Sequence, residues 1–289
     1  MPLLKVQLNH PGKEKIFRIG KGYHIEGNLI MRDWNDELKH YRKFIRCGGQ
    51  YLTDLKSKPN KALLYFWGEW EGHSIFTPLE SEKPNGIHEP FHSLQNVGRM
   101  NTDPYVYGTD FKYATCSQTG KLGDLSPDSL VFFGTTTDNG FELDTVFVVK
   151  SHETAESVFK TSAAAYSDTY KEQTVARLGE AYLGPRYSIS KKIYRSISWW
   201  DNPNYFSFVP CRLNYLEQPS KVVLPIPPFS SQKVGHPFSH LDKYDHELLW
   251  TLVVTEVLKQ GFCIGIRFTE PNCSQRGTYP QIRLAWIIG

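Results

Sequence analysis

The sequence predicts an α+β fold built on a mixed or mainly antiparallel sheet with a few flanking helices. Short runs of β-branched and aromatic residues outnumber the stretches with helical periodicity, and the two kinds of segment are interspersed along the chain. Aromatic residues are abundant, with 17 Phe, 16 Tyr and 7 Trp, and flat rings pack well on pleated surfaces. The sequence contains no internal repeat and no coiled-coil heptads, so an ordinary globular sheet is expected.

Length and composition are those of one large domain. A chain of 289 residues can bury a substantial core without disulfides or structural metals. Its hydrophobic fraction of 40% and charged fraction of 22% are ordinary for a globular protein and exclude wholesale disorder. We predict a single domain over residues 1–289, with the proline- and serine-rich stretch 219–237 as the best candidate for a boundary.

The net charge, the cysteines and the hydropathy of the chain limit its possible partners and its cellular location. The net charge of +3 permits an anionic partner but is too small to indicate a protein that coats DNA non-specifically. The five cysteines form no CxxC pair, so neither a zinc ribbon nor a redox motif is predicted, and a reducing cytosol is the simplest location. No signal peptide and no apolar run of roughly 18–20 residues is present. We therefore expect a cytoplasmic protein without a membrane partner, and the oligomeric state is left open.

The first hundred residues predict two short strands, a helix, a longer strand and a loop. The strands show alternating or continuous apolar residues, whereas the helix is predicted because apolar residues recur at helical spacing between residues 38 and 45. The loop is rich in Pro, Gly, Asn, Ser and His, and a connection of this length is usually functional. In order, the segments are 4–8, 16–19, 34–55, 62–67 and 77–99.

The strongest strand signal is a hairpin between residues 129 and 149. The runs 129–133 and 141–149 are almost continuously apolar and β-branched, which is typical of strands buried on both faces. The connection 134–140 contains the dipeptide Asn139-Gly140, which is typical of tight hairpin turns.

The remainder of the chain predicts two helices and three strands. The first helix covers about 153–170, where small and apolar residues form one stripe. The second helix is clearer, because Ser239 or Asp242 can cap its start and Gly261 ends it. Its predicted apolar face consists of Leu248, Leu249, Leu252, Val253 and Val257. The predicted strands are 205–209, 262–268 and 282–288.

The densest polar and aromatic segment follows the strand at 62–67. If the strand alternation continues, Trp67, Glu69 and Glu71 lie on one side and Trp70 lies on the other. Two carboxylates beside an indole can bind a metal ion, or can accept hydrogen bonds from the edge of a base that stacks on a tryptophan. The alternative is an exposed strand end with solvated glutamates and core tryptophans.

Histidines in the predicted loop give a weaker signal. His88 and His92 have the i, i+4 spacing of zinc ligands on a helix, but Pro90 between them argues against a helix. A surface loop with unrelated histidines is the simpler interpretation.

Asp144 is the most informative single residue. It lies between Leu143 and Val146 in the strongest predicted strand, where a bare carboxylate is expensive to bury. It must therefore face solvent, a pocket or a partner. An anchored arginine or a capped loop would explain it structurally, and a place in a functional site would explain it equally well.

Two modest basic groups are candidates for phosphate contacts. The first surrounds Arg42, and the second surrounds Arg186, where Tyr and Trp residues interleave with the basic ones. Basic side chains beside rings suit a phosphate backbone with stacked bases. A solvated surface is nevertheless the commoner meaning of such groups.

The stretch 122–134, followed by 141–149, resembles part of the PUA-like barrel families, which include EVE and ASCH domains. The similar features are the strand entry Pro127-Asp128-Ser129, an aliphatic-aromatic strand and a second strand that ends in valines. The resemblance implies a small β-barrel whose mouth binds a base, often a modified or flipped one, and it extends to nucleotide-modification-associated proteins. The residues that this analogy places near the pocket are Trp67, Glu69 and Trp70.

Three functional hypotheses follow. The first is a module that binds nucleic acid or a nucleotide, in which aromatic rings stack a base, Glu69 or Asp144 accepts hydrogen bonds from it, and arginines meet phosphate. The base-stacking candidates are Trp67, Trp70 and Tyr107, and the phosphate-binding candidates are Arg42 and Arg186.

The second hypothesis is an enzyme that acts on nucleotides or nucleic acid, with Mg²⁺ or Mn²⁺ if a metal is used. Its catalytic candidates are Glu69, Glu71, Asp144 and His88. The third is a protein-interaction component that uses exposed aromatic residues.

Overall fold

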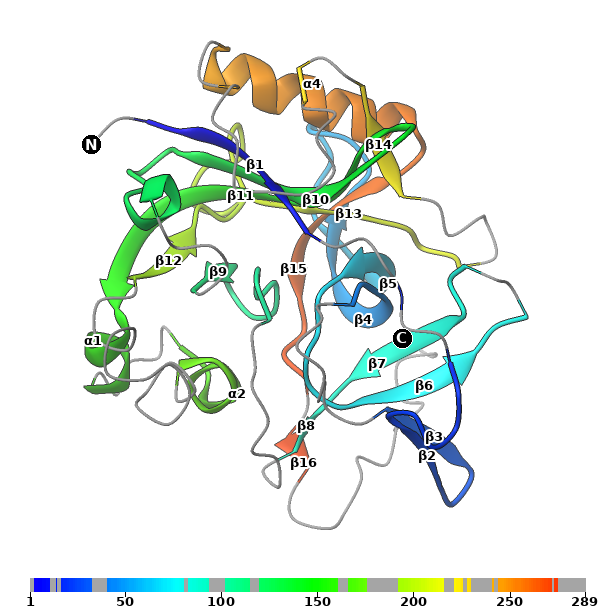
Figure 1. Cartoon of the computed structure of the whole chain (residues 1–289). Coiled ribbons are helices and arrows are strands. Elements are labelled where there is room, and N and C mark those ends of the chain that lie inside the picture. The colour runs from blue at the N-terminus through cyan, green and yellow to red at the C-terminus, as the bar shows by residue number, and fades with distance from the viewer. Residues whose placement is uncertain are drawn as a thin grey trace.

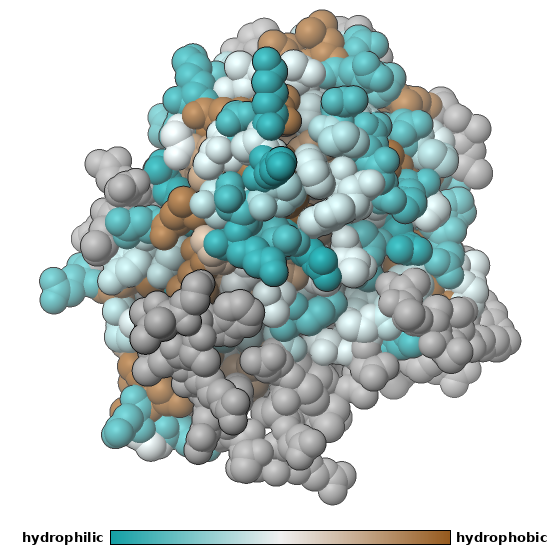
Figure 2. Space-filling view, turned by 180° about the vertical axis from the view of Figure 1, so that it is seen from behind, coloured by the Kyte–Doolittle hydropathy of each residue, from teal (hydrophilic) through white to brown (hydrophobic). Residues whose placement is uncertain are grey.

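Two β-sheets, accompanied by helices, form the part of the chain that the structure describes (Figure 1). The structure is a computed structural model. Seen from behind, the described surface is mostly hydrophilic with scattered apolar residues (Figure 2), as is usual for a folded chain in water. The described residues are 3–10, 14, 17–32, 41–80, 83–93, 102–114, 120–160, 166–175, 192–215, 221–225, 228–229, 241, 244–271 and 273–274.

The first sheet is built around the predicted hairpin. Its strand order is β1-β10-β11-β12-β9, and β14 pairs with β11 on a separate stretch of that long strand. The β1–β10 pair is parallel and the other pairs are antiparallel. The strands are β1 (Lys5–Asn9), β9 (Lys112–Tyr113), β10 (Leu130–Thr137), β11 (Gly140–Thr154), β12 (Lys192–Ser196) and β14 (Val222–Leu224).

The second sheet has the order β13-β15-β4-β7-β6-β3-β2, and β5 pairs with β4 along nearly its whole length. Only the β4–β7 contact in this sheet is parallel among the described pairs. The strands are β2 (Tyr23–Glu26), β3 (Leu29–Arg32), β4 (Lys43–Leu52), β5 (Asn60–Gly68), β6 (Ser74–Pro78), β7 (Gly86–Pro90), β13 (Val209–Cys211) and β15 (Cys263–Phe268). A separate short parallel pair joins β8 (His92–Ser93) to β16 (Cys273–Ser274).

The longest described helix, α4 (His246–Lys259), lies across one side of the β10–β11 hairpin (Figure 1). Asp245 caps it, because its side chain accepts a hydrogen bond of 2.9 Å from the backbone N–H of Leu248. Gly261 follows the helix at φ +75°, a conformation that favours glycine. The shorter helices are α1 (Ala155–Lys160), α2 (Asp168–Gln173) and the 3-10 helix η1 (Gly120–Gly123).

The segment 205–212 connects the two sheets. Phe208 forms a bridge with Val146 of β11, the next residues form β13 beside β15, and Arg212 then exchanges two backbone hydrogen bonds with Tyr65 of β5. The hydrophobic clusters also mix the two sheets, since one contains Val6 and Phe66. The ends of both sheets are therefore held close to each other, and this is where the candidate site lies.

The structure confirms the α+β class, and it contains no closed barrel among the described strands. The strands predicted at 62–67 and 262–268 and the 129–149 hairpin are present. The helix predicted over 34–55 is wrong for its second half, where β4 runs from Lys43 to Leu52. Pairing with β5 and β15 outweighs the helical spacing of a few apolar residues there. Residues 33–40 and 282–288 lie outside the described part.

Other boundaries also differ from prediction. The loop predicted at 77–99 contains β7 and β8, and β7 lies inside the second sheet between β4 and β6, so the polar composition of this stretch did not indicate a loop. The strand predicted at 205–209 begins at Val209, and the helix predicted at 153–170 begins at Ala155 and is described as two short pieces. The helix cap is Asp245 rather than Ser239 or Asp242. Leu248 and Leu252, predicted on the apolar face of α4, are 56% and 52% exposed.

No helix in the described part of the chain is long and apolar enough to span a membrane. The proposed domain boundary at 219–237 is described only in part.

Candidate functional site

Arg42 connects the two carboxylates that the sequence singled out. Its Nη2 lies 2.9 Å from Asp144 Oδ2, and its Nη1 lies 3.5 Å from Glu69 Oε2. His10 also belongs to this group, because Arg42 Nη2 lies 2.6 Å from its Nδ1. These side chains are almost fully buried, so each charge depends on the others for stabilisation.

The sequence positions of these residues explain why they meet. Arg42 lies just before β4 and Glu69 just after β5, at one end of the second sheet. Asp144 lies within β11 and His10 just after β1, both in the first sheet. Of the explanations left open for Asp144, which were solvent, a pocket or a partner, the structure shows a buried carboxylate paired with an arginine. We call these four residues the Arg42 junction.

Lys221 lies at the border of the Arg42 junction. Its Nζ is 3.4 Å from Glu142 Oε2 and 3.7 Å from Asp144 Oδ1, and it forms no hydrogen bond with any described residue. The same nitrogen lies 5.0 Å from the ring centroid of Trp67, which is a cation–π distance. Lys221 therefore contacts two carboxylates at ion-pair distance and the face of one indole ring. It directly precedes β14, whose pairing with β11 fixes its backbone position.

A small hollow opens beside Lys221 and Trp67. A second cation faces it, since Arg212 Cζ lies 4.0 Å from the ring centroid of Phe262. The space between the lining side chains measures about 10 Å³, roughly what one water molecule needs. The lining residues are Phe44, Tyr65, Phe66, Trp67, Leu143, Pro210, Arg212, Lys221, Val222 and Phe262.

Glu71 and His88 belong to a different buried group. Lys43 Nζ lies 3.5 Å from Glu71 Oε1, and His88 Nδ1 shares a 2.8 Å hydrogen bond with the Ser74 hydroxyl. Burial, followed by the neighbouring Arg32, lowers the pKa of Lys43 to about 7. Burial also lowers the pKa of His88 well below its ordinary value. The four predicted catalytic side chains are thus divided between two groups.

The other predicted residues lie in varied places. Trp70 and Tyr107 are fully buried against each other, with ring centroids 5.3 Å apart, so they contribute to the core in this conformation. Trp67 lines the hollow. Arg42 is buried within the junction, and Arg186 lies outside the described residues.

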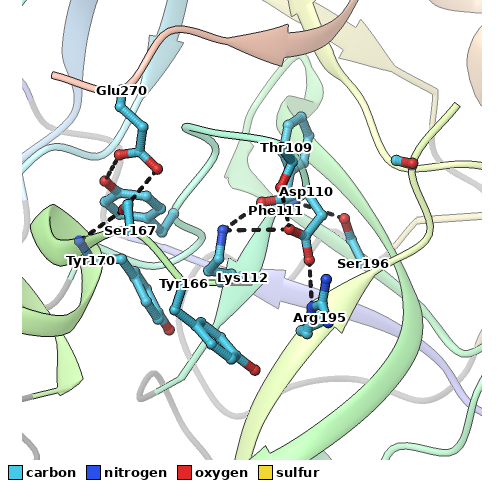
Figure 3. A network of polar contacts seen from close by, with 12 residues as sticks. Thr109, Asp110, Phe111, Lys112, Tyr166, Ser167, Tyr170, Arg195, Ser196 and Glu270 are labelled. Atoms are coloured by element: carbon cyan, nitrogen blue, oxygen red, sulfur yellow. Dashed lines mark hydrogen bonds and ion pairs between the residues drawn. The ribbon is translucent and has the colours of Figure 1, made fainter. Parts of the chain in front are cut away.

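A third polar network, around Lys112, was not predicted from the sequence (Figure 3). Lys112 Nζ donates a 2.9 Å hydrogen bond to the Asp110 carbonyl, and the Asp110 carboxylate accepts one of 2.8 Å from Arg195 Nε. The ammonium also lies over the rings of Tyr105 and Tyr170, at 5.7 and 5.4 Å. Burial lowers its pKa.

Glu270 belongs to the same network and lies near Ser167 and Tyr170 (Figure 3). It accepts hydrogen bonds from the Tyr105 hydroxyl and, at 2.9 Å, from Ser167. No sequence motif marks this network, because its members come from β9, β12, α2 and the end of β15.

The sequence also gave no signal for His10, Lys221 or Arg212. Lys221 lies in the proline- and serine-rich stretch 219–237, which the sequence marks only as a candidate domain boundary. Glu14 was missed as well: burial raises its pKa to about 7, and Lys221 and Lys83 act against that rise.

The described carboxylates and histidines offer no ready metal centre. No group of three or more His, Cys, Asp or Glu residues suited to a metal ion occurs in the described ranges. Glu69, Glu71 and Asp144 each have a basic neighbour within 3.5 Å. Comparisons with protein-family models, with curated proteins and with solved structures gave no match for this chain.

Proposed function

We propose that this chain binds a nucleotide, free or as part of a nucleic acid, at the hollow beside Trp67. One observation carries the proposal: Trp67, a predicted base-stacking residue, forms a wall of the described hollow, and the amine of Lys221 covers its ring at 5.0 Å. A nucleotide combines a flat ring with a phosphate. The hollow offers aromatic faces and two cations, which match these two parts.

Each of the two cations covers an aromatic face beside the hollow. Lys221 lies over Trp67, and Arg212 lies over Phe262. The hollow has room for roughly one water molecule, so a base gains access when these side chains swing off the rings. Lys221 can do so more easily than Arg42 could leave its carboxylates, because the Lys221 ion pairs of 3.4 and 3.7 Å include no hydrogen bond to a described residue. After this movement, both cations can contact the phosphate.

The geometry favours binding over the metal-dependent alternative. A metal ion between Glu69 and Asp144 would have to displace Arg42, which pairs with both. Glu71 and His88 belong to the separate group around Lys43. Breaking such buried pairs is expensive.

Isothermal titration with small probes tests the proposal. AMP and UMP, the 5′-monophosphates of adenosine and uridine, are expected to bind. Adenosine, which has the base but no phosphate, and ribose 5-phosphate, which has the phosphate but no base, are expected to bind more weakly. Lys221→Gln and Arg212→Gln are expected to weaken nucleotide binding about five-fold or more each, since each removes a charged contact. Trp67→Phe keeps a ring in place and is expected to have a smaller effect than Trp67→Leu.

Lys259→Gln is the matched control, because it removes one exposed lysine at the end of α4. It is expected to bind like the unmodified protein. Absence of heat with every nucleotide, or equal binding by the control and the Lys221 and Arg212 variants, would overturn the proposal.

A further inference from the structure

One face of β5 leads from solvent to the hollow. Strand alternation places Lys61, Leu63, Tyr65 and Trp67 on this face, while the alternate residues pack into the core. Lys61 and Leu63 are exposed, and Tyr65 and Trp67 line the hollow. The four residue steps from Lys61 to Tyr65 span about 14 Å. An extended ligand that lies on this face can therefore reach the hollow.

Basic side chains gather at the exposed end of that face. Gln50 of β4 pairs with Lys61 on one side and with Arg267 of β15 on the other, so both cations flank it on the same face. Lys56 and Lys58 are exposed in the turn between β4 and β5. The only acid in this turn is Asp54, whose carboxylate accepts a 2.8 Å hydrogen bond from the backbone N–H of Lys56. The turn and its flanking strands thus carry a local positive charge.

An exposed indole completes the surface. Trp200 is 47% exposed, and Arg267 Cζ lies 5.8 Å from its ring centroid. Exposed aromatic rings beside cations bind unstacked bases, which stack on the ring while the cations contact the backbone. A duplex hides its base faces, so this combination fits a single strand better than a double helix.

We propose that Lys56, Lys58, Lys61, Arg267 and Trp200, here called the basic track, bind single-stranded nucleic acid. The inference rests on the proposed nucleotide site and extends it from a single nucleotide to a polymer. A base stacks on Trp200, the lysines and Arg267 contact phosphates, and the strand continues along β5 so that one nucleotide enters the hollow. The continuity of the β5 face from Lys61 to Trp67 is the observation that joins the two sites.

Fluorescence anisotropy with a labelled oligothymidylate of about 12 nucleotides tests the track, measured over a salt series. The triple variant Lys56→Ala, Lys58→Ala, Lys61→Ala is expected to bind about ten-fold more weakly at low salt. The slope of log affinity against log salt should fall by about 2, since each single-strand phosphate contact contributes about 0.7. Trp200→Ala is expected to weaken binding about five-fold with little change of slope.

The matched control is a second triple variant, Lys21→Ala, Lys83→Ala, Lys171→Ala, which also removes three positive charges. Its residues lie away from the basic track, in the turn before β2, in the turn between β6 and β7, and in α2. It is expected to retain the full affinity. Equal losses in both triple variants would show general electrostatic attraction and would overturn the track. So would an oligonucleotide that binds no more tightly than a mononucleotide, a result that leaves the nucleotide site intact. Failure of mononucleotides to bind would instead remove the proposed function itself.

Discussion

Arg42 Nη2 lies 2.9 Å from Asp144 Oδ2, and this buried ion pair joins the end of one sheet to the middle of a strand in the other. The same guanidinium reaches Glu69. Two carboxylates therefore share one arginine in a region without solvent to screen them. Lys221 also lies 3.7 Å from Asp144, but Arg42 is the described cation that contacts both carboxylates, so the stability of the junction between the sheets depends strongly on it.

Arg42→Met is expected to lower the free energy of unfolding by about 3–5 kcal/mol, because it leaves Glu69 and Asp144 buried without the arginine. Urea unfolding followed by circular dichroism measures the loss. Adding Glu69→Gln and Asp144→Asn to Arg42→Met should recover part of the stability, since the uncompensated charges are then gone.

Lys150→Met serves as the control for Arg42→Met. It breaks an exposed ion pair of 2.6 Å with Asp201, and such surface pairs contribute about 0–1 kcal/mol. A loss of this small size in Arg42→Met as well would contradict the importance assigned to the junction.

Lys43 is expected to make stability rise with pH. Its pKa in the folded state is about 7, below its ordinary value of 10.5, so between these values the unfolded chain binds more protons than the folded one. The free energy of unfolding then increases with pH across that window, by up to about 1.4 kcal/mol per pH unit. Below pH 7 the ammonium is present in both states, and the cost of burying it is complete.

Lys43→Met removes this titration. Unfolding of both proteins between pH 7 and 9.5 should show the unmodified protein gaining stability relative to the variant. Lys259→Met, which removes an exposed lysine, should show no such trend. If the free energy of unfolding changed with pH in the same way for Lys43→Met and the unmodified protein, the lowered pKa of Lys43 would be ruled out.

The strand that carries Asp144 could be predicted, whereas its partner could not. The apolar runs and the Asn139-Gly140 turn are local signals, and the structure has the hairpin where they indicate it. The cost of burying a lone carboxylate limited Asp144 to solvent, a pocket or a partner, and the structure shows a partner, Arg42. Arg42 lies 102 positions earlier in the chain, and only the packing of two sheets brings it there.

The region of β4 shows why local patterns were insufficient. Phe44, Arg46 and Gln50 lie on one face of β4, where Phe44 is buried and the other two are partly buried, while Gly48 and Gly49 weaken both the strand and the helix signal. The pairing with β5 supplies the hydrogen bonds that decide the conformation. Lys221, Arg212 and the Lys112 network could not be predicted for the same reason, because their contacts are with residues that are distant in the sequence.

Glu14 is expected to make stability fall with rising pH. Its pKa in the folded state is raised by burial to about 7 from 4.5, so the folded chain holds more protons between these values. The stability present below pH 4.5 is lost as the pH rises through 7, by up to about 3 kcal/mol. Glu14→Gln is neutral throughout and should lack this fall.

Chemical unfolding at pH 5 and pH 7.5 compares Glu14→Gln with the unmodified protein. The exposed Glu247→Gln provides the control, since an exposed carboxylate has no burial to relieve. An equal pH dependence in the Glu14 variant and the unmodified protein would contradict the assignment of a buried, protonated carboxyl at residue 14.

Substitutions of Lys112 and of Asp110 are expected to lower the free energy of unfolding by very different amounts. Lys112→Met removes a buried ammonium, yet Asp110 keeps Arg195 at 2.8 Å and Glu270 keeps Tyr105 and Ser167. The variant should therefore lose no more than about 1 kcal/mol. Asp110→Asn instead leaves two cations without their shared carboxylate and should lose about 3 kcal/mol or more. Urea unfolding at one pH compares the two variants, and a greater loss in Lys112→Met than in Asp110→Asn would show that the ammonium, rather than the carboxylate, organises this network.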